Sequence, residues 1–203
     1  MDPGFWEELA GLDPQSVCRR SGAVVERNGY RLRVFDGDYF IQPSQRRISM
    51  SRVGADPGRV GPGVSDTLEM VIVHYLINAR DIPPADEWVG LQELGTGGQF
   101  FVSHVPDYGR ILPLFSASPE AVTRSARAMG GRLLDTGDVS VAFQMLPRVP
   151  VGFVYWAASE EFPANVSVLF DRTVEQHLPL DVLSAAIQAA IGRLAAATRE
   201  EGG

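Results

Sequence analysis

The stretch DTLEMVIVHYLI, residues 66–77, decides the fold of this 203-residue chain. After its first turn it is apolar on every side, and a helix of that kind is normally central and buried. Asp66 and Glu69 have the spacing of a capping box, with aspartate in place of the usual serine or threonine. We therefore expect a buried helix from Asp66 to about Ala79, with His74 as the polar residue in its middle.

Short alternating stretches precede this helix. The pairs Asn28-Gly29 and Asp36-Gly37 are typical of tight hairpin turns. They predict three antiparallel strands in a meander, at residues 23–26, 30–35 and 39–41. Residues 43–63 are rich in glycine, proline and arginine, which predicts a loop.

The second half of the chain alternates helical and strand patterns. Ser118-Pro119 is typical of a helix start, and Gly130-Gly131 of its end. Three apolar or alternating runs predict strands, at residues 139–145, 151–156 and 166–170. Pro179 begins a last helix with a buried stripe, which includes Leu183, Ile187, Ile191 and Leu194.

These elements predict an α+β fold, with a mainly antiparallel sheet packed against a central buried helix and a C-terminal helix. We find no internal repeat and no low-complexity linker. We expect one globular domain over residues 1–203, with a helical N-terminal arm at residues 1–22 and a frayed tail at residues 198–203.

Composition excludes several classes of function. The hydrophobic share of 45% is ordinary for a globular core, and the net charge of -7 disfavours a nucleic-acid partner. The acidic start and short apolar runs predict neither a leader peptide nor a membrane span. Cys18 is the one cysteine, so the chain cannot form an intrachain disulfide or hold a four-cysteine cluster. A cytoplasmic location is the simplest interpretation.

All 18 basic residues other than histidine are arginines. Schiff-base chemistry and pyridoxal-phosphate attachment require a primary amine on the side chain, and a P-loop requires a lysine. The absence of lysine from the sequence therefore excludes these three mechanisms.

His74 and His177 are the histidines of most interest. His74 on an apolar helix is either a core residue bonded to a carbonyl or to a carboxylate such as Asp171, or a ligand to a metal, corrinoid or tetrapyrrole. His177, just before Pro179, is a surface loop residue, a helix-end cation that offsets the helix dipole, or a ligand. Asp171 follows an apolar run, where it could cap a short helix. No spacing indicates a two-histidine, one-carboxylate iron site, so we predict no metal.

Arginines gather just before the predicted central helix. Arg46, Arg47, Arg52 and Arg59 occur with one acidic residue, Asp56, in a segment that leads to a helix N-terminus. Guanidinium groups and exposed amides together suit phosphate or carboxylate groups. The alternative is a solvated loop. By contrast, the pair Glu160-Glu161 and the run at residues 95–98 are typical of turns.

Five short motifs occur in order along the chain: VHYL at 73–76, LPRVPV at 146–151, EEFPA at 160–164, LFD at 169–171 and HLP at 177–179. They resemble an uncharacterised family of anaerobic bacteria and archaea known only as a domain of unknown function. The resemblance covers most of the chain. It implies anaerobic cofactor metabolism, since some members carry a four-cysteine iron–sulfur domain of the type found in corrinoid-protein systems. This chain, with Cys18 alone, lacks that domain, and the resemblance implies no catalytic residue.

We therefore expect a binding or accessory domain for an anionic cofactor such as a corrinoid or haem. The candidate cofactor-binding residues are His74, Tyr75, His177, Asp171, Arg46, Arg47 and Arg52. The alternative is an interaction module that docks on a redox or methyl-transfer partner through an apolar face around Phe5, Trp6 and the last helix. An enzyme acting on a small substrate ranks below both, because no nucleophile, base and orienting group can be assembled.

Overall fold

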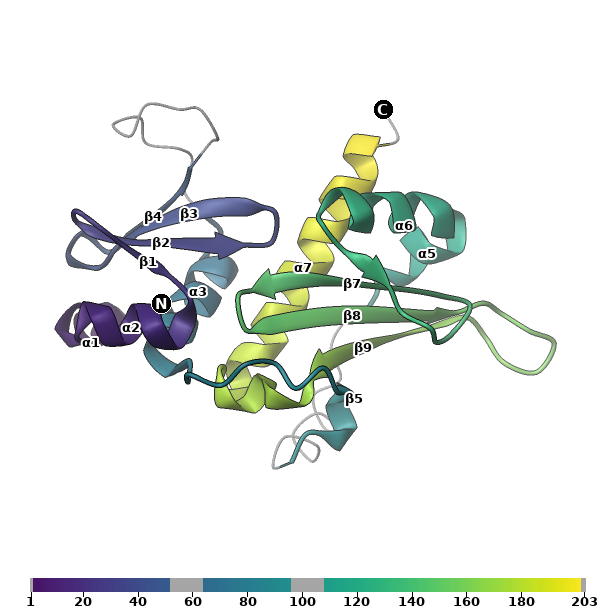
Figure 1. The fold of residues 1–203 in the computed structure, drawn as a ribbon. Coiled ribbons are helices and arrows are strands. Elements are labelled where there is room, and N and C mark those ends of the chain that lie inside the picture. Colours follow the sequence, from purple (N-terminus) through teal and green to yellow (C-terminus); the bar gives the residue numbers. More distant parts are fainter. Residues whose placement is uncertain (1, 52–63, 96–107, 202–203) are drawn as a thin grey trace.

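The computed structural model describes residues 2–51, 64–95 and 108–201. Two antiparallel sheets lie on either side of the helix α3, which contacts α1, α2 and the long last helix α7 (Figure 1). The α+β class and the C-terminal helix are confirmed. One hydrophobic cluster runs through both sheets and the helices between them.

The first sheet has the order β1-β2-β3-β4, one strand more than predicted. Its elements and the helices that precede it are α1 (Pro3–Gly11), α2 (Pro14–Ser21), β1 (Val24–Glu26), β2 (Gly29–Val34), β3 (Gly37–Gln42), the 3-10 turn η1 (Pro43–Gln45) and β4 (Arg47–Ser51). The fourth strand corrects the prediction of a loop from residue 43. Ile48 and Ser49 are buried while Arg47 is exposed, so β4 has no alternating pattern, and glycine, proline and arginine surround it in the sequence.

Both hairpin turns lie one residue earlier than predicted. The pairs Glu26↔Gly29 and Val34↔Gly37 leave two residues in each turn, 27–28 and 35–36. Phe35 takes a left-handed φ of 53°, and its N–H donates to the Met145 carbonyl of the second sheet at 2.8 Å. Packing of Phe35 between the two sheets therefore outweighs the preference of glycine for the turn.

Helix α3 runs from Asp66 to Asn78, close to the predicted bounds. Its N-cap is Ser65, whose hydroxyl accepts a hydrogen bond from the Leu68 N–H at 3.3 Å, so the assignment of the cap to Asp66 was wrong by one residue. The consecutive residues from Val71 to Leu76 are all buried, which confirms the central, buried helix.

The second sheet has the order β5-β9-β8-β7-β6, and all its pairs are antiparallel. Its strands and the helices around them are β5 (Trp88–Gly90), η2 (Leu91–Glu93), α5 (Leu112–Ala117), α6 (Pro119–Ala128), β6 (Arg132–Leu133), β7 (Val139–Leu146), β8 (Val149–Trp156), β9 (Asn165–Asp171), η3 (Arg172–Gln176) and α7 (Leu180–Glu201). The three predicted strands and both predicted helices are present.

Helix α7 lies across one face of this sheet (Figure 1). It continues to Glu201, so residues 198–201 form its last turn. In the described part of the chain, Leu180–Glu200 is the one helix long and apolar enough to cross a membrane, and half of its apolar stretch is buried in the fold. A buried core helix has the same length and composition.

Candidate functional site

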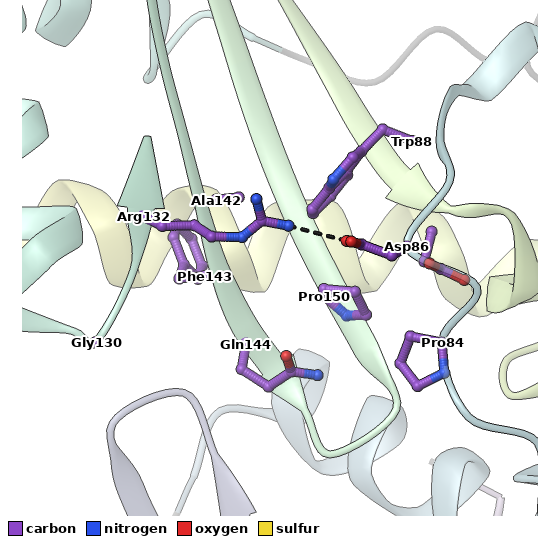
Figure 2. A pocket seen from close by; sticks show the side chains of 10 residues that line it. Pro84, Asp86, Trp88, Gly130, Arg132, Ala142, Phe143, Gln144 and Pro150 are labelled. Carbon is purple, nitrogen blue, oxygen red and sulfur yellow. Dashed lines mark hydrogen bonds and ion pairs between the residues drawn. The ribbon is translucent and has the colours of Figure 1, made fainter. Parts of the chain in front are cut away.

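A pocket of about 230 Å³ lies on the face of the second sheet opposite α7 (Figure 2). In Figure 2 α7 passes behind the strands, and the side chains that line the pocket stand in front of them. Its lining comes from all five strands of the sheet, from the α6–β6 turn and from the segment before β5: Pro84, Asp86, Trp88, Gly130, Arg132, Ala142, Phe143, Gln144, Pro150 and Asp171.

The strand register explains why a pocket forms on this face of the sheet. Arg132 pairs with Ala142, and Ala142 pairs with Gly152, so small residues occupy the centre of this face. The Trp88 ring covers the glycine: a Cβ at Gly152 would lie 3.3 Å from a ring carbon of Trp88. Trp88 lies on β5, the strand at the other edge of the sheet, and pairs there with Asp171 of β9. The pocket is thus bounded by a guanidinium and an indole over a floor of small side chains.

Arg132 bridges the other two polar features of the pocket. Its Nη2 donates to Asp86 Oδ1 at 3.0 Å, and its guanidinium carbon lies 5.7 Å from the centre of the Trp88 ring (Figure 2). The Arg132 and Asp86 side chains are 60% and 83% exposed, so a solute can reach both. Asp86 has a left-handed φ of 57°, a conformation that aspartate and asparagine adopt more readily than most residues.

Asp171 provides a second carboxylate at the edge of the pocket, and its own hydrogen bonds hold it in place. Its Oδ1 accepts bonds from the Thr173 N–H, the Thr173 hydroxyl and the Ala85 N–H, at 3.0, 2.6 and 3.0 Å. Burial acts to raise the pKa of Asp171, but these hydrogen bonds and one from the Asp86 backbone hold the pKa below its usual value. The predicted capping role is confirmed, because Asp171 is the N-cap of η3.

The chain between α3 and β5, residues 79–87, is the connecting segment that supplies Asp86. Polar contacts hold it along its length. Arg20 donates to the Ala79 carbonyl at 2.6 Å, and Asp81 Oδ1 accepts from Arg148 at 2.6 Å. The Ala85 N–H donates to Asp171, and the Arg172 N–H donates to the Glu87 carbonyl at 2.9 Å. The position of Asp86 is therefore set by contacts on both sides of it.

His177 belongs to the same region but is fully buried, which contradicts its assignment to the surface. Its Nδ1 accepts from the Arg80 N–H at 3.4 Å, so the neutral ring carries its proton on Nε2. That buried Nε2 has no hydrogen-bond partner among the described residues. Burial, reinforced by the charges of Arg148 and Arg80 and opposed by Asp171, lowers the pKa of His177 to about 4.

Tyr75 has a structural role beside His177. Its hydroxyl donates to the Ser21 carbonyl at 2.7 Å and accepts from the Arg148 N–H at 3.2 Å. These two bonds join α2, α3 and the β7–β8 turn. Burial raises the pKa of Tyr75 far above its usual value. The Tyr75 hydroxyl is therefore a neutral group with both bonding partners inside the protein.

His74 lies on another side of α3, under α1. Its ring centroid is 4.2 Å from that of Phe5, and the residue is 8% exposed. Burial lowers the pKa of His74, against the opposing effect of Asp181 and Glu8. The structure does not pair His74 with Asp171, whose Oδ1 accepts hydrogen bonds from Ala85 and Thr173.

Of the arginines predicted to bind an anion, the structure describes Arg46 and Arg47. Arg46 pairs with Glu7 of α1 at 2.8 Å, and Arg47 is the first residue of β4. Arg52 lies outside the described residues, as do Arg59, His104 and residues 96–98. Glu160 and Glu161 lie in the exposed β8–β9 turn as predicted. Across the described ranges, no group of three or more His, Cys, Asp or Glu side chains could hold a metal ion.

Of the apolar face predicted around Phe5, Trp6 and the last helix, Trp6 is buried and Phe5 is half-buried. Trp6 is 3% exposed, and its indole N–H donates to Glu69 at 3.3 Å. Among the described residues, the large exposed apolar side chains are Val24, Val25, Leu133, Trp156 and Phe162.

Sequence reasoning missed the pocket because its residues are far apart along the chain. Trp88, Arg132 and Gln144 come from three strands and meet only through the strand register. One local signal was present. Gln144 is the polar, exposed residue in the otherwise buried run of β7, and it marks the face on which the pocket lies.

Comparison with known proteins gives one match. A family described as a domain of unknown function, DUF3786, matches residues 13–192, which is most of the chain. No curated protein and no protein of solved structure matches this chain.

Proposed function

Because this chain belongs to the DUF3786 family, for which no function is known, we propose its function from the pocket on the second sheet. We infer that the protein is a cytoplasmic binding or accessory domain, and that the pocket holds a small molecule with an anionic group at Arg132. The observation that carries the proposal is the exposed Arg132 guanidinium beside an indole, above a floor of small residues.

The chemistry of the lining supports this function. The planar guanidinium of Arg132 can bind a carboxylate or phosphate through two hydrogen bonds. Trp88 offers a flat apolar surface on the same side, and the Gln144 amide lies across the pocket from it (Figure 2). Apolar walls with a few converging polar groups are typical of small-molecule sites. The lining contains no cysteine, serine or histidine that could act as a nucleophile.

Pocket size restricts the ligand. A pocket of about 230 Å³ is smaller than the roughly 300–1,000 Å³ of sites that enclose drug-sized ligands. A corrinoid or haem, the cofactors suggested by the resemblance, would therefore lie over the rim and place only an acidic side arm beside Arg132. Axial ligation by His74 would require α1 to move, because the Phe5 ring packs on the imidazole.

The first test is a titration with 3-phenylpropionate, which has one carboxylate and one flat ring. We expect binding detected by calorimetry, with Arg132→Gln weakening it about tenfold, since a charge-assisted hydrogen bond is lost. Arg27→Gln, an exposed arginine in the β1–β2 turn, is the matched control. Equal affinity for the two variants would refute the assignment of the anionic group to Arg132.

The tetrapyrrole version has its own test. Purified protein is titrated anaerobically with cobalamin and with haem, and the visible spectrum is recorded. A spectral shift that His74→Ala or His177→Ala abolishes, while circular dichroism shows an intact fold, would identify an axial ligand. A shift that only Arg132→Gln weakens would indicate binding by a side arm. No shift with either compound would leave only the smaller ligands.

A second candidate function, docking on a redox or methyl-transfer protein, rests on the β8–β9 hairpin. Trp156 is 40% exposed at the end of β8, and Phe162 in the following turn is 69% exposed. Exposed aromatic side chains are common at protein interfaces. A pull-down from the native host should retain a specific partner with the wild-type chain and lose it with the Trp156→Ser, Phe162→Ser variant. Equal recovery by both would refute this docking surface.

A further inference from the structure

We propose that the ligand of the pocket is a zwitterion of amino-acid size, whose cationic group binds between Asp86 and Trp88 while its anionic group binds Arg132. This inference rests on the proposed function, because it assigns a ligand class to the same pocket. It is carried by the arrangement of Arg132, Asp86 and Trp88 and by the sum of charges around them.

The charges of the pocket disfavour a ligand that is only anionic. Arg132 supplies one positive charge, whereas Asp86 and Asp171 supply two negative charges. An anion that took Arg132 away from Asp86 would leave Asp86 unpaired and close to a like charge. A zwitterion avoids this, since its cationic group takes the place of the guanidinium at Asp86. One internal ion pair is then replaced by two pairs with the ligand.

Trp88 and Asp86 already form a site for a cation. A carboxylate beside the face of an indole is an arrangement that binds ammonium and guanidinium groups. The Arg132 guanidinium occupies it, 3.0 Å from Asp86 and 5.7 Å from the centre of the Trp88 ring. We infer that the Arg132 guanidinium fills the cation site when no ligand is bound, and that an ammonium or guanidinium group of a ligand can take its place.

Only the side chain of Arg132 has to move for this exchange. The preceding Gly131 is packed so closely that a Cβ there would lie 2.6 Å from the carbonyl oxygens of Ala126 and Ala142. Its backbone is therefore held against α6 and β7. Arg132 itself lies on the edge strand β6, and its side chain is 60% exposed. The guanidinium can rotate to the rim and receive a carboxylate there while the strand remains paired.

Three probes of similar shape separate the charges: phenylalanine, 3-phenylpropionate, which lacks the ammonium group, and phenethylamine, which lacks the carboxylate. Calorimetric titration of the whole chain should show phenylalanine binding about fivefold more tightly than either analogue, as expected for one exposed ion pair. Asp86→Asn should remove the advantage of phenylalanine over 3-phenylpropionate. Arg132→Gln should remove its advantage over phenethylamine.

The variants are chosen so that the fold is retained. Asparagine tolerates the left-handed backbone at residue 86, and Arg27→Gln is the control on the other sheet. A second variant, Gly152→Ala, narrows the pocket from its floor, because the new Cβ would lie 3.2 Å from Leu134 and 3.3 Å from Trp88. It should weaken all three probes about equally, while circular dichroism and urea unfolding remain close to the wild type.

The outcomes distinguish this inference from the proposed function. If phenylalanine is preferred and Asp86→Asn removes that preference, the zwitterion assignment stands. If 3-phenylpropionate binds as tightly as phenylalanine and depends on Arg132, the inference is overturned and the proposed function remains. If none of the three probes binds, or if the pocket variants do not alter binding, both are overturned.

Discussion

Tyr75 decides whether the region around His177 is structural or part of a binding site, and Tyr75→Phe tests it. The substitution removes a hydroxyl that donates to the Ser21 carbonyl at 2.7 Å and accepts from the Arg148 N–H at 3.2 Å. Tyr75 is fully buried, so water cannot replace the lost bonds. A buried donor or acceptor left without a partner costs about 1–3 kcal/mol. With two such groups, only partly relieved by relaxation, we expect a loss of about 2–3 kcal/mol.

The assay is equilibrium unfolding in urea, followed by circular dichroism. For m-values of about 1–3 kcal/mol per M, this loss moves the unfolding midpoint down by roughly 1 M. The matched control is Tyr155→Phe. Among the described residues, the Tyr155 hydroxyl has one hydrogen bond, a long one of 3.4 Å to the Ser116 hydroxyl, so its removal should cost less than about 1 kcal/mol.

Two results would refute this reasoning. If Tyr75→Phe and Tyr155→Phe were equally destabilising, the two bonds of Tyr75 would not hold the region together. If Tyr75→Phe left stability unchanged but abolished binding of a pocket ligand, Tyr75 would be a ligand contact. That result would support the prediction of Tyr75 as a cofactor-binding residue.

Three further predictions concern charge and backbone conformation. The pKa of His177 is about 4 in the folded protein, below its usual 6.5, so between these pH values the unfolded chain binds more protons than the folded one. The free energy of unfolding should therefore fall by up to about 3 kcal/mol as the pH drops from 6.5 to 4. Urea unfolding at several pH values measures this decrease, and His177→Gln should make it smaller. The Asp36 carboxylate accepts hydrogen bonds from Nε and Nη2 of Arg193, at 2.8 and 2.5 Å, and this interaction is the main cause of its lowered pKa. The stability that the carboxylate contributes is therefore present at neutral pH and lost in acid, so Asp36→Asn should cost about 1–2 kcal/mol at pH 7 and much less in acid. An equal loss at both pH values would contradict this. Gly130 and Gly137 both have left-handed φ angles, 78° and 66°. A Cβ at Gly137 would lie 2.5 Å from a methyl carbon of Val154, whereas a Cβ at Gly130 would meet nothing within 4 Å. Gly130→Ala should therefore cost only the backbone strain of about 1–2 kcal/mol, and Gly137→Ala should lower the thermal midpoint clearly more.

Most of the fold could be predicted because its strongest patterns are local. The apolar run of α3 and the buried stripe of α7 are determined by sequence periodicity, and both helices are present. The strand β4 could not be recognised, because five residues without alternating burial, next to a segment rich in glycine and proline, carry little signal. Its existence depends on pairing with β3, from Asp38↔Ser51 to Gln42↔Arg47. Such pairing is a non-local contact, which composition does not report.

The candidate site was harder to predict for a related physical reason. His74, Tyr75 and His177 stand out in the sequence as polar residues among apolar ones. In the structure all three are buried: the Tyr75 hydroxyl has two partners inside the fold, His177 is bonded through Nδ1 alone, and the His74 ring packs on Phe5. Arg132 and Trp88 attract no attention in the sequence, since an exposed arginine or tryptophan is unremarkable singly. They become a site only when the sheet places them across the small residues Ala142 and Gly152.

The buried polar residues nevertheless bear on the pocket, through the connecting segment. That segment is bound by His177 at Arg80 and by Arg148 at Asp81, and it then carries Asp86 to the pocket. A residue with a left-handed backbone has few alternative positions, so the distance from Asp86 to Arg132 depends on where the segment is held. We therefore expect the buried histidine to act on ligand binding only through the placement of Asp86. Its substitution should reduce the preference for a cationic group while leaving the contribution of the carboxylate at Arg132 unchanged.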